Sequence, residues 1–439
     1  MCRSTGFLLY LTVWCSCCNP IQRYHPGEHL ADAIRSNLFA SLSHRHSFHG
    51  GSARTMRAAS RKILLGGGII LITAMAAAKP GAGGADRKLD GPAEPPLDRV
   101  LLISGHSLTD LAYANILQKI SQTQGRSMEF EVQAAPGSTL HDRFHGASKR
   151  MMGSSEVTDR AGMDQQAPAL RYYLEKRVYS QMVVTEQHRL LDALLWDQTA
   201  QSLALTARQF HAHNPAAAIR FFIPWLSVSD RDNPAAWIRY ERRAHDIWLC
   251  LVNDVNRHLK TTGTQNEIEP LPIALALASL AEQLTVSPML QGFQGLPISE
   301  RMAQIFRDDV HLTQLGTLYT AMVSSAWIDG KVPELNKAWI DSRDRGQAEA
   351  LQKIAAAFVD RYRLEQRSTE PCRAMQRWAF IAHYVRYTAS TFDGVDMGAA
   401  ARIWRQLTRA IRFYWRFWDG LDGGIALSDK GKAGGGVLA

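Results

Sequence analysis

The stretch RVLLISGHSLTD, residues 99–110, decides the fold. Its first six residues form a short apolar run that is typical of a buried parallel strand. Gly105 then permits a tight turn, and residues 109–122 carry apolar side chains at helical spacing. Ser107 therefore lies where a strand turns into a helix, near the free N–H groups of the helix start. A nucleophilic serine and a helix N-cap both fit this position, and the two interpretations are equally open.

The alternation of strand and helix continues along the chain. Apolar runs predict further strands at residues 128–134, 181–185, 219–226 and 271–275, and helical spacing predicts helices at 170–178, 194–210, 235–259 and 313–328. Strands separated by helices of this length imply a parallel sheet that is covered on both faces. We therefore expect an α/β fold of three layers (α/β/α) with a mainly parallel five-stranded sheet. In such sheets the chemistry lies in loops at the carboxyl ends of the strands.

The charge of the chain is concentrated at its N-terminus. The 439 residues carry a formal net charge of +9, but residues 1–78 hold eight basic and two acidic side chains, which leaves +3 for the rest. A body with so little charge excess has no electrostatic footprint for nucleic acid, so we predict no nucleic-acid partner. No apolar run reaches the ~20 residues of a confident membrane span, which argues against a protein with several spans.

Residues 56–78 have the pattern of a signal peptide. Arg57, Arg61 and Lys62 precede an apolar run at 63–75, and three alanines offer a cleavage site. An uncleaved anchor is the alternative, but the apolar run is short for one. We expect residues 1–55 to be an upstream extension of the reading frame before a true start at Met56, although residues 6–14 offer a second signal. Residues 79–97 are rich in Gly and Pro and predict a flexible linker. Either signal predicts a periplasmic or secreted protein.

The cysteines do not predict a metal site. Four of the six lie in the first eighteen residues, and no Cys/His pair follows at zinc-finger spacing. Cys250 lies in the apolar run 247–252 and is expected to be a buried thiol rather than a disulfide partner. We predict no metal.

A second motif, Asp308-Asp309-Val310-His311, precedes the last predicted helix of the sheet domain. An Asp three residues before a His can accept from the imidazole Nδ1–H and fix the tautomer whose Nε2 takes a proton from a serine. Asp309 is a rival to Asp308 for this role, and a capping Asp beside a surface His is the plainer interpretation. Each motif alone is common, but their joint placement with Ser107 favours a catalytic site.

These residues resemble the SGNH/GDSL serine hydrolases. Gly105-His106-Ser107-Leu108 is similar to the first block of that family, with His106 in place of the acid, and Asp308–His311 followed by Leu312-Thr313-Gln314-Leu315-Gly316 matches its last block. The resemblance covers residues 98–330. It implies the flavodoxin-like three-layer fold of the family, ester or acyl chemistry, and neither metal nor cofactor. Carried over, Ser107 is the nucleophile, His311 the general base and Asp308 its orienting partner.

The two inner blocks of the family are less well matched. The resemblance places Gly137, after the second strand, as an oxyanion-hole donor beside the Ser107 N–H, although a plain Pro-Gly turn also explains it. The family's third block normally supplies an Asn, which this chain lacks. Gln187 is in register and its amide is the implied substitute. The adjacent Glu186 and His188 are either substrate contacts or ordinary loop residues.

Two regions fall outside the catalytic scheme. Residues 138–169 form a long polar insertion of the kind that shapes substrate access. Residues 331–439 predict a helical extension with a frayed tail at 434–439. The mixture of Arg and aromatic residues at 403–418 can lie on a membrane or stack on sugars, but packing on the hydrolase core is the favoured interpretation.

Together these features predict an exported serine esterase. Acylated glycans and lipid esters are the substrates that the resemblance and the location imply. Two alternatives remain: an O-acyltransferase that uses the same triad on a sugar hydroxyl, and an inactive SGNH fold that binds glycans. Membrane association is expected only through an uncleaved signal or through the C-terminal aromatic helices.

Overall fold

The structure is a computed structural model that describes residues 97–146, 168–264, 266–330, 332–335, 340–342, 344–365, 374–392 and 398–420. The predicted upstream extension, the signal peptide and the linker up to residue 96 lie outside these residues. So do residues 147–167 of the polar insertion and the tail at 434–439. Predictions for these segments therefore stay predictions.

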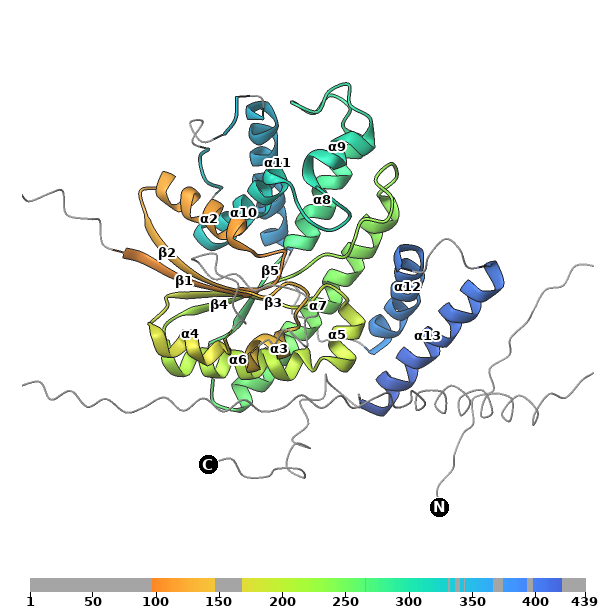
Figure 1. Cartoon of the computed structure of the whole chain (residues 1–439), viewed down its shortest axis with the longest axis horizontal. Coiled ribbons are helices and arrows are strands. Elements are labelled where there is room, and N and C mark those ends of the chain that lie inside the picture. The colour runs from red at the N-terminus through yellow and green to blue at the C-terminus, as the bar shows by residue number, and fades with distance from the viewer. Residues whose placement is uncertain are drawn as a thin grey trace, which may run out of the picture. The chain divides into compact units, whose positions relative to one another are not determined.

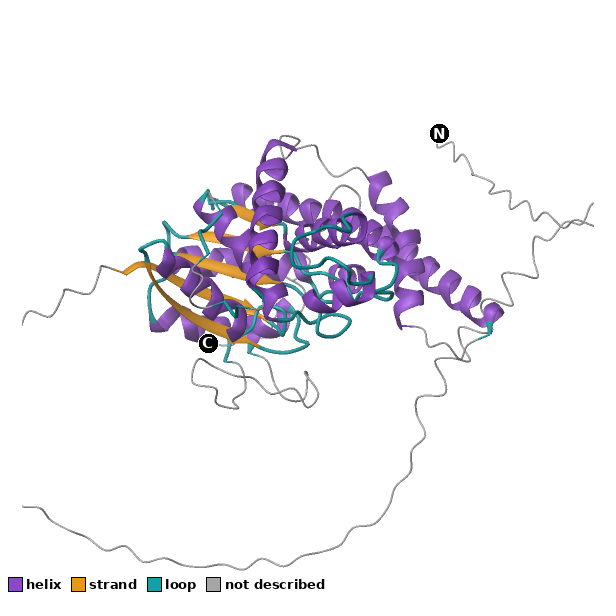
Figure 2. Cartoon of the chain, turned by 90° about the horizontal axis from the view of Figure 1, so that it is seen from above, coloured by secondary structure: helices purple, strands orange, loops and turns teal. Residues whose placement is uncertain are grey.

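The sheet has five strands, all parallel, in the order β2-β1-β3-β4-β5 (Figure 1). The strands are β1 (Leu97–Gly105), β2 (Ser127–Ala134), β3 (Gln181–Thr185), β4 (Ala218–Phe222) and β5 (Ile268–Leu271). Seen from above, they lie side by side as one twisted layer (Figure 2). This confirms the predicted α/β class, and the sheet is wholly rather than mainly parallel. The strand order is that of flavodoxin-like folds.

Helices cover both faces of the sheet (Figure 1). Above it in that view lie α2 (Leu111–Thr123), α8 (Ile273–Val286), α9 (Ile298–Ile305), α10 (Gln314–Asp329) and α11 (Arg345–Glu365). Below it lie α3 (Leu140–His145), α4 (Leu170–Lys176), α5 (Leu190–Trp196) and α6 (Thr199–His213). The long helix α7 (Ala235–Thr261) packs against α6, α8 and β5.

The predicted C-terminal helical region is also confirmed. After α11 come α12 (Ala374–Phe392), which contacts α7, and α13 (Ala399–Gly420), which contacts α12 and α5. Tyr240 of α7 stacks on Tyr387 of α12 with ring centroids 4.7 Å apart. Part of this region therefore packs on the body that holds the sheet. No helix in the described part of the chain is both long and apolar enough to cross a membrane.

Several element boundaries differ from the predicted ones. The single helix expected at 194–210 is two helices, α5 and α6, because the backbone at Gln198 is left-handed with φ +54°. Strand β4 ends at Phe222 and not at residue 226, since Pro224 has no N–H to donate to a neighbouring strand. The fifth strand is at 268–271, and α8 occupies most of the stretch expected to hold it. Helix α8 was missed because it is apolar on nearly all sides and shows no amphipathic period.

The expectation for Cys250 was wrong. The residue is buried as predicted, but it is disulfide-bonded. A buried apolar run does not by itself distinguish a free thiol from a disulfide.

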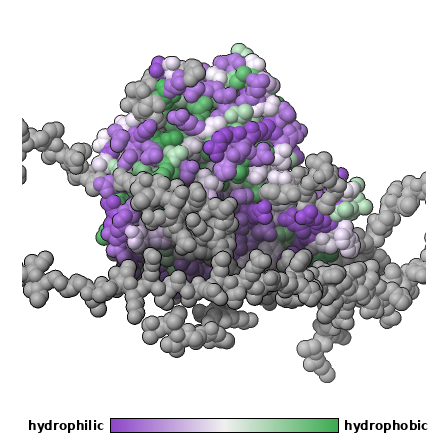
Figure 3. All heavy atoms as spheres, viewed as in Figure 1, coloured by the Kyte–Doolittle hydropathy of each residue, from purple (hydrophilic) through white to green (hydrophobic). Residues whose placement is uncertain are grey.

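The strand order fixes where a site can form. From β1 the chain passes through α2 to β2 on one side, whereas β3, the other neighbour of β1, leads into α5 on the opposite face. Loops therefore diverge at the carboxyl ends of β1 and β3 and leave a crevice between them. Gly105, His106 and Ser107 open the loop that follows β1. The surface around the body, as Figure 3 shows for one face, is mainly hydrophilic with smaller apolar areas.

Candidate active site

Three residues predicted from the two motifs meet at this crevice. The Nε2 atom of His311 lies 3.0 Å from the Oγ atom of Ser107, and its Nδ1 atom lies 2.8 Å from Asp308 Oδ2. An ionised carboxylate only accepts, so Nδ1 carries the proton of the neutral imidazole. Nε2 is then the acceptor, and the Ser107 hydroxyl donates to it. This is the tautomer that a serine nucleophile requires.

Ser107 is not a helix N-cap. That position in α2 belongs to Asp110, whose Oδ1 accepts from the N–H groups of Ala112 and Tyr113 at 3.0 and 3.4 Å. The turn before the serine requires glycine for lack of space, because a Cβ on Gly105 would lie 1.8 Å from Thr109 Oγ1. The Ser107 hydroxyl is thereby left half-buried at the end of β1, free to pair with His311.

The His311 loop is held in place from several sides. The indole of Trp225, after β4, donates to the Val310 carbonyl at 2.8 Å, and the Arg307 N–H donates to the His311 carbonyl at 2.8 Å. Gly316 lets α10 approach the loop, since a Cβ there would lie 2.3 Å from the Ile305 carbonyl oxygen. Backbone and core contacts, rather than the histidine's own packing, therefore set the position of the imidazole.

Of the two aspartates before His311, only Asp308 bonds the imidazole. Burial alone would raise the pKa of Asp308, but hydrogen bonds from the N–H groups of His311 and Val310 and from the imidazole lower it to about 2. The carboxylate is therefore ionised at neutral pH. Asp309 is 78% exposed and pairs with Arg231 at 3.8 Å. Asp308, which the spacing of the family motif implies for this role, is therefore the aspartate that contacts His311.

His106 links the first strand's loop to the third strand's loop. Its Nε2–H donates to the Glu186 carbonyl at 2.9 Å, and its Nδ1 accepts weakly from the Leu108 N–H at 3.4 Å. Burial, followed by the charge of Arg143, lowers the pKa of His106 to about 3. The imidazole is therefore neutral and tethers the Ser107 turn to the end of β3.

Glu186 and Arg143 form a buried polar centre beneath these loops. Glu186 accepts from the N–H groups of Leu140 and Gln187 at 2.9 and 2.7 Å and from the Thr199 hydroxyl at 2.8 Å. Burial raises the pKa of Glu186 to about 7, against the opposing effects of Arg143 and these hydrogen bonds.

The Arg143 guanidinium reaches the ends of all three strands around the site. It donates to Ser104 Oγ at 3.3 Å, to the Ser138 carbonyl at 3.0 Å, and to the Thr185 carbonyl. Ser104, Ser138 and Thr185 belong to or follow β1, β2 and β3 respectively. A single buried cation therefore fixes the relative positions of the loops that carry the candidate site.

Gly137 lies in a turn that is anchored beside Ser107. The Ser138 N–H donates to the Ala135 carbonyl at 3.0 Å, and the Ala135 N–H donates to the Gly105 carbonyl at 2.9 Å. Gly137 has φ +71°, which favours glycine. Among the described residues, neither the Gly137 N–H nor the Ser107 N–H has a hydrogen-bond acceptor. The turns that follow β1 and β2 thus each offer a backbone donor.

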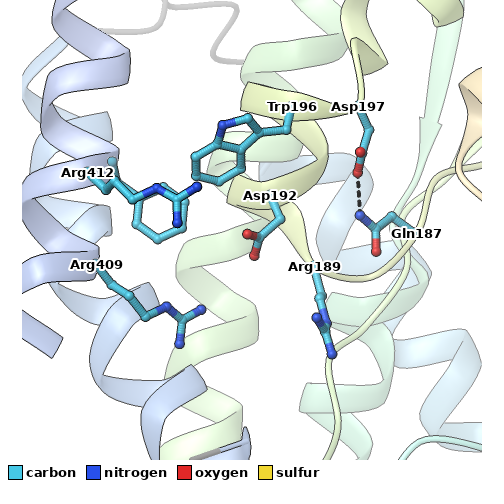
Figure 4. A pocket seen from close by; sticks show the side chains of 8 residues that line it. Gln187, Arg189, Asp192, Trp196, Asp197, Arg409 and Arg412 are labelled. Atoms are coloured by element: carbon cyan, nitrogen blue, oxygen red, sulfur yellow. Dashed lines mark hydrogen bonds between the residues drawn. The ribbon is translucent and has the colours of Figure 1, made fainter. Parts of the chain in front are cut away.

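The structure does not bring Gln187 to Ser107. Its side-chain amide donates to Asp197 Oδ2 at 2.5 Å and lines a different pocket, between α5 and α13 (Figure 4). The following residue, His188, lies closer to the site: its ring is 6.5 Å from that of His106. Burial, with repulsion from Arg189 and His311, lowers the pKa of His188 to about 4. Gln187 has the sequence position of the Asn in the family block, but its side chain contacts Asp197 and does not reach Ser107.

A pocket of about 390 Å³ opens beside Ser107 and His311. Leu108, Ile116, Trp225 and Leu312 give it apolar walls, and Arg307 and Thr317 lie at its polar parts. Trp225, which lies in the stretch predicted as a strand at 219–226, is fully buried and still borders this pocket. The lining therefore mixes apolar and polar side chains.

Sequence reasoning missed the buried polar centre. Arg143 lies within the polar insertion, where no sequence pattern indicates burial, and Glu186 is predicted as a substrate contact or an ordinary loop residue, not as a buried acid. The sequence feature that could have indicated this centre is Glu186, an acidic residue directly after the strand predicted at 181–185. Among the described residues, no three His, Cys, Asp or Glu side chains are grouped to hold a metal ion.

Comparisons with known proteins give only remote likeness. No family model and no curated protein matches the chain. Among solved structures, it is similar to a DUF4886 family protein from Bacteroides uniformis, with 11% identity and a TM-score of 0.40 over 63% of this chain and 98% of the other. It is also similar to a family two carbohydrate esterase from Clostridium thermocellum, solved in complex with cellohexaose. That match has 14% identity and a TM-score of 0.31 and covers 54% of this chain and 65% of the other.

Proposed function

We propose that the protein is a serine hydrolase that cleaves carboxylic esters. The observation that carries this proposal is the unbroken line of hydrogen bonds from Ser107 through His311 to Asp308. A serine hydroxyl is a weak nucleophile until an adjacent base accepts its proton, and that base needs a third group to hold its tautomer. All three groups are present, in order, at the edge of the sheet where chemistry is expected.

The reaction would proceed in two halves. Ser107 Oγ attacks the ester carbonyl carbon while its proton passes to His311 Nε2. The resulting oxyanion accepts from the Ser107 and Gly137 N–H groups. The carbon–oxygen bond to the alcohol then breaks, and His311 returns the proton to the leaving alkoxide. Water attacks the acyl-enzyme with His311 again as base, which releases the acid and restores the Ser107 hydroxyl.

The surroundings of the triad support ester substrates with an apolar portion. Leu108, Ile116 and Leu312 offer an acyl chain apolar contacts beside the hydroxyl, and Asp110, Arg307 and Gln314 offer polar contacts to the rest of the ester. Acylated glycans and lipid esters both offer such a group. We also propose that the protein is exported to the periplasm or secreted. The disulfide at Cys250 supports an oxidising compartment.

Hydrolysis of p-nitrophenyl esters from acetate to octanoate tests this function. We expect the purified full chain to turn these esters over and Ser107→Ala and His311→Ala to lose activity by about 10³-fold or more. His213→Ala is the matched control, because His213 is an exposed histidine of α6 far along the chain from the triad. A parent chain that is no faster than its Ser107→Ala variant would overturn the proposal.

A further inference from the structure

Helix α13 exposes an apolar stripe along its outer side. Its members are large residues at helical spacing with exposed fractions between 45% and 66%: Ile403, Trp404, Leu407, Ile411 and Trp415. They extend over about 18 Å, at 1.5 Å per residue. Water-exposed stripes of this size are rare unless another apolar phase covers them.

The helix is attached to the body by its opposite side. Phe413, only 2% exposed, packs against Trp196 of α5 and Tyr384 of α12 with ring centroids 5.2 and 5.4 Å away. Residues of the stripe are not among those packed on the core. The contacts with α5 and α12 therefore hold α13 with its apolar side outward.

Arginines lie on the side of α13 away from this stripe. Residues 399–418 contain five arginines and no acidic residue. Arg405 and Arg412, seven residues apart, lie on the same side of the helix and are both exposed. The Arg412 guanidinium is 5.2 Å from the Trp196 ring centroid. An apolar face with a tryptophan near each end, and arginines on the other face, is the pattern of a helix that lies on a membrane.

Arg409 and Arg412 also line a pocket between α13 and α5 (Figure 4). The pocket has a volume of about 350 Å³, and the guanidinium groups of Arg189, Arg409 and Arg412 lie around it. Asp192 and Asp197 line it too: the Asp192 carboxylate accepts from the Tyr384 hydroxyl at 2.5 Å, and the Asp197 carboxylate accepts from the Gln187 amide at 2.5 Å. Neither Arg409 nor Arg412 forms an ion pair with a described residue. Planar guanidinium groups bind phosphate oxygens well.

We propose that α13 binds the surface of a membrane that contains anionic phospholipid. The apolar stripe enters the boundary between headgroups and acyl chains, and the arginines on the other side of the helix supply positive charge that attracts the anionic headgroups. Both features lie on one helix and require one kind of partner. The proposal does not depend on the ester hydrolysis proposed above.

Co-sedimentation of the full chain with vesicles tests the proposal. We expect binding to vesicles of phosphatidylcholine mixed with phosphatidylglycerol and much weaker binding to phosphatidylcholine alone. Trp404→Ser with Leu407→Ser should weaken binding by about tenfold or more, because both side chains leave the acyl boundary. Leu364→Ser is the matched control, since Leu364 is 70% exposed on α11.

A second pair of variants tests the cationic side of α13. Arg409→Gln with Arg412→Gln should weaken binding to the anionic vesicles by about thirtyfold, at ~1 kcal/mol per cation near the surface. Arg171→Gln with Arg208→Gln removes the same charge from exposed sites on α4 and α6 and should change binding less than about twofold. Thermal unfolding midpoints are measured for all four variants to check that each remains folded.

Three results would overturn the proposal. The first is no vesicle binding by the parent chain. The second is binding that survives the α13 substitutions and disappears in Ile70→Asp, which would assign it to the apolar run at 63–75 instead. The third is a dimer in sedimentation equilibrium that Trp404→Ser with Leu407→Ser dissociates, without vesicle binding, because the stripe would then be covered by a second copy.

Discussion

His311 Nε2 lies 3.0 Å from Ser107 Oγ, although 204 residues separate the two along the chain. The parallel sheet explains this proximity, because it brings the carboxyl ends of β1 and β4 to one edge. Trp225, just after β4, then holds the His311 loop through the Val310 carbonyl. The fold, and not sequence proximity, therefore brings the serine and the histidine together.

Asp308→Asn should lower kcat by about 10²–10⁴-fold with little change in KM, because an amide in place of the carboxylate favours the wrong imidazole tautomer. Asp309→Asn is the matched control and should stay within about twofold, since Asp309 is 78% exposed and does not touch the imidazole. Steady-state hydrolysis of a p-nitrophenyl ester measures both. Equal losses in the two variants would contradict the assignment of Asp308.

Gln187→Ala should change kcat by less than about threefold. Loss of a true oxyanion donor costs about 10²–10³-fold, but the Gln187 amide donates to Asp197. The same ester assay measures the effect, with Ser107→Ala as the reference for complete loss. A hundredfold loss in Gln187→Ala would mean that the amide turns to the substrate during the reaction.

His106 should make the protein sensitive to acid. Its pKa is about 3 in the folded chain, against 6.5 for an exposed histidine. Between these values the unfolded chain binds a proton that the folded chain does not, so the free energy of unfolding falls as the pH is lowered from 6.5 toward 3. The slope is at most about 1.4 kcal/mol per pH unit.

Urea denaturation of the parent and of His106→Gln at several pH values measures this effect. Glutamine does not titrate, so the stability advantage of the parent should shrink as the pH falls. Parallel pH curves for the two proteins would show that His106 is not held neutral in the fold.

Arg143→Met should lower the free energy of unfolding by about 3–5 kcal/mol, because it removes the cation beside the buried Glu186 and leaves three loops without their common donor. Arg242→Met is the control. Arg242 pairs with Glu282 at the surface, where such pairs contribute about 1 kcal/mol or less. Urea denaturation compares the two, and similar losses would contradict a supporting role for Arg143.

The elements with a strong local signal could be predicted from the sequence. Strand β3 was predicted at its observed bounds because its apolar run is short and unbroken, and Ser107, Asp308 and His311 came from motifs at a strand end and before a helix. Helix α8 could not be predicted, since burial on nearly all sides removes its amphipathic period. The break at Gln198 depends on a left-handed backbone in a residue that rarely adopts it.

The side-chain contacts around the site could not be predicted from the sequence, for another reason. Gln187 is in register with a family block, yet the rotation of its amide toward Asp197 depends on the start of α6, which no pattern indicated. Arg143 becomes buried only when β1, β2 and β3 come together. Such contacts are properties of the assembled loops and not of any one segment.

The central claim is that Ser107 is activated by His311, and covalent labelling with a fluorophosphonate tests it most directly. The reagent phosphonylates an activated serine with loss of fluoride, and intact mass with peptide mapping locates the adduct. We predict one adduct per chain on Ser107, which is absent in Ser107→Ala and slowed by about 10³-fold or more in His311→Ala. An unlabelled parent chain, or an adduct that forms equally fast in His311→Ala, would contradict the account.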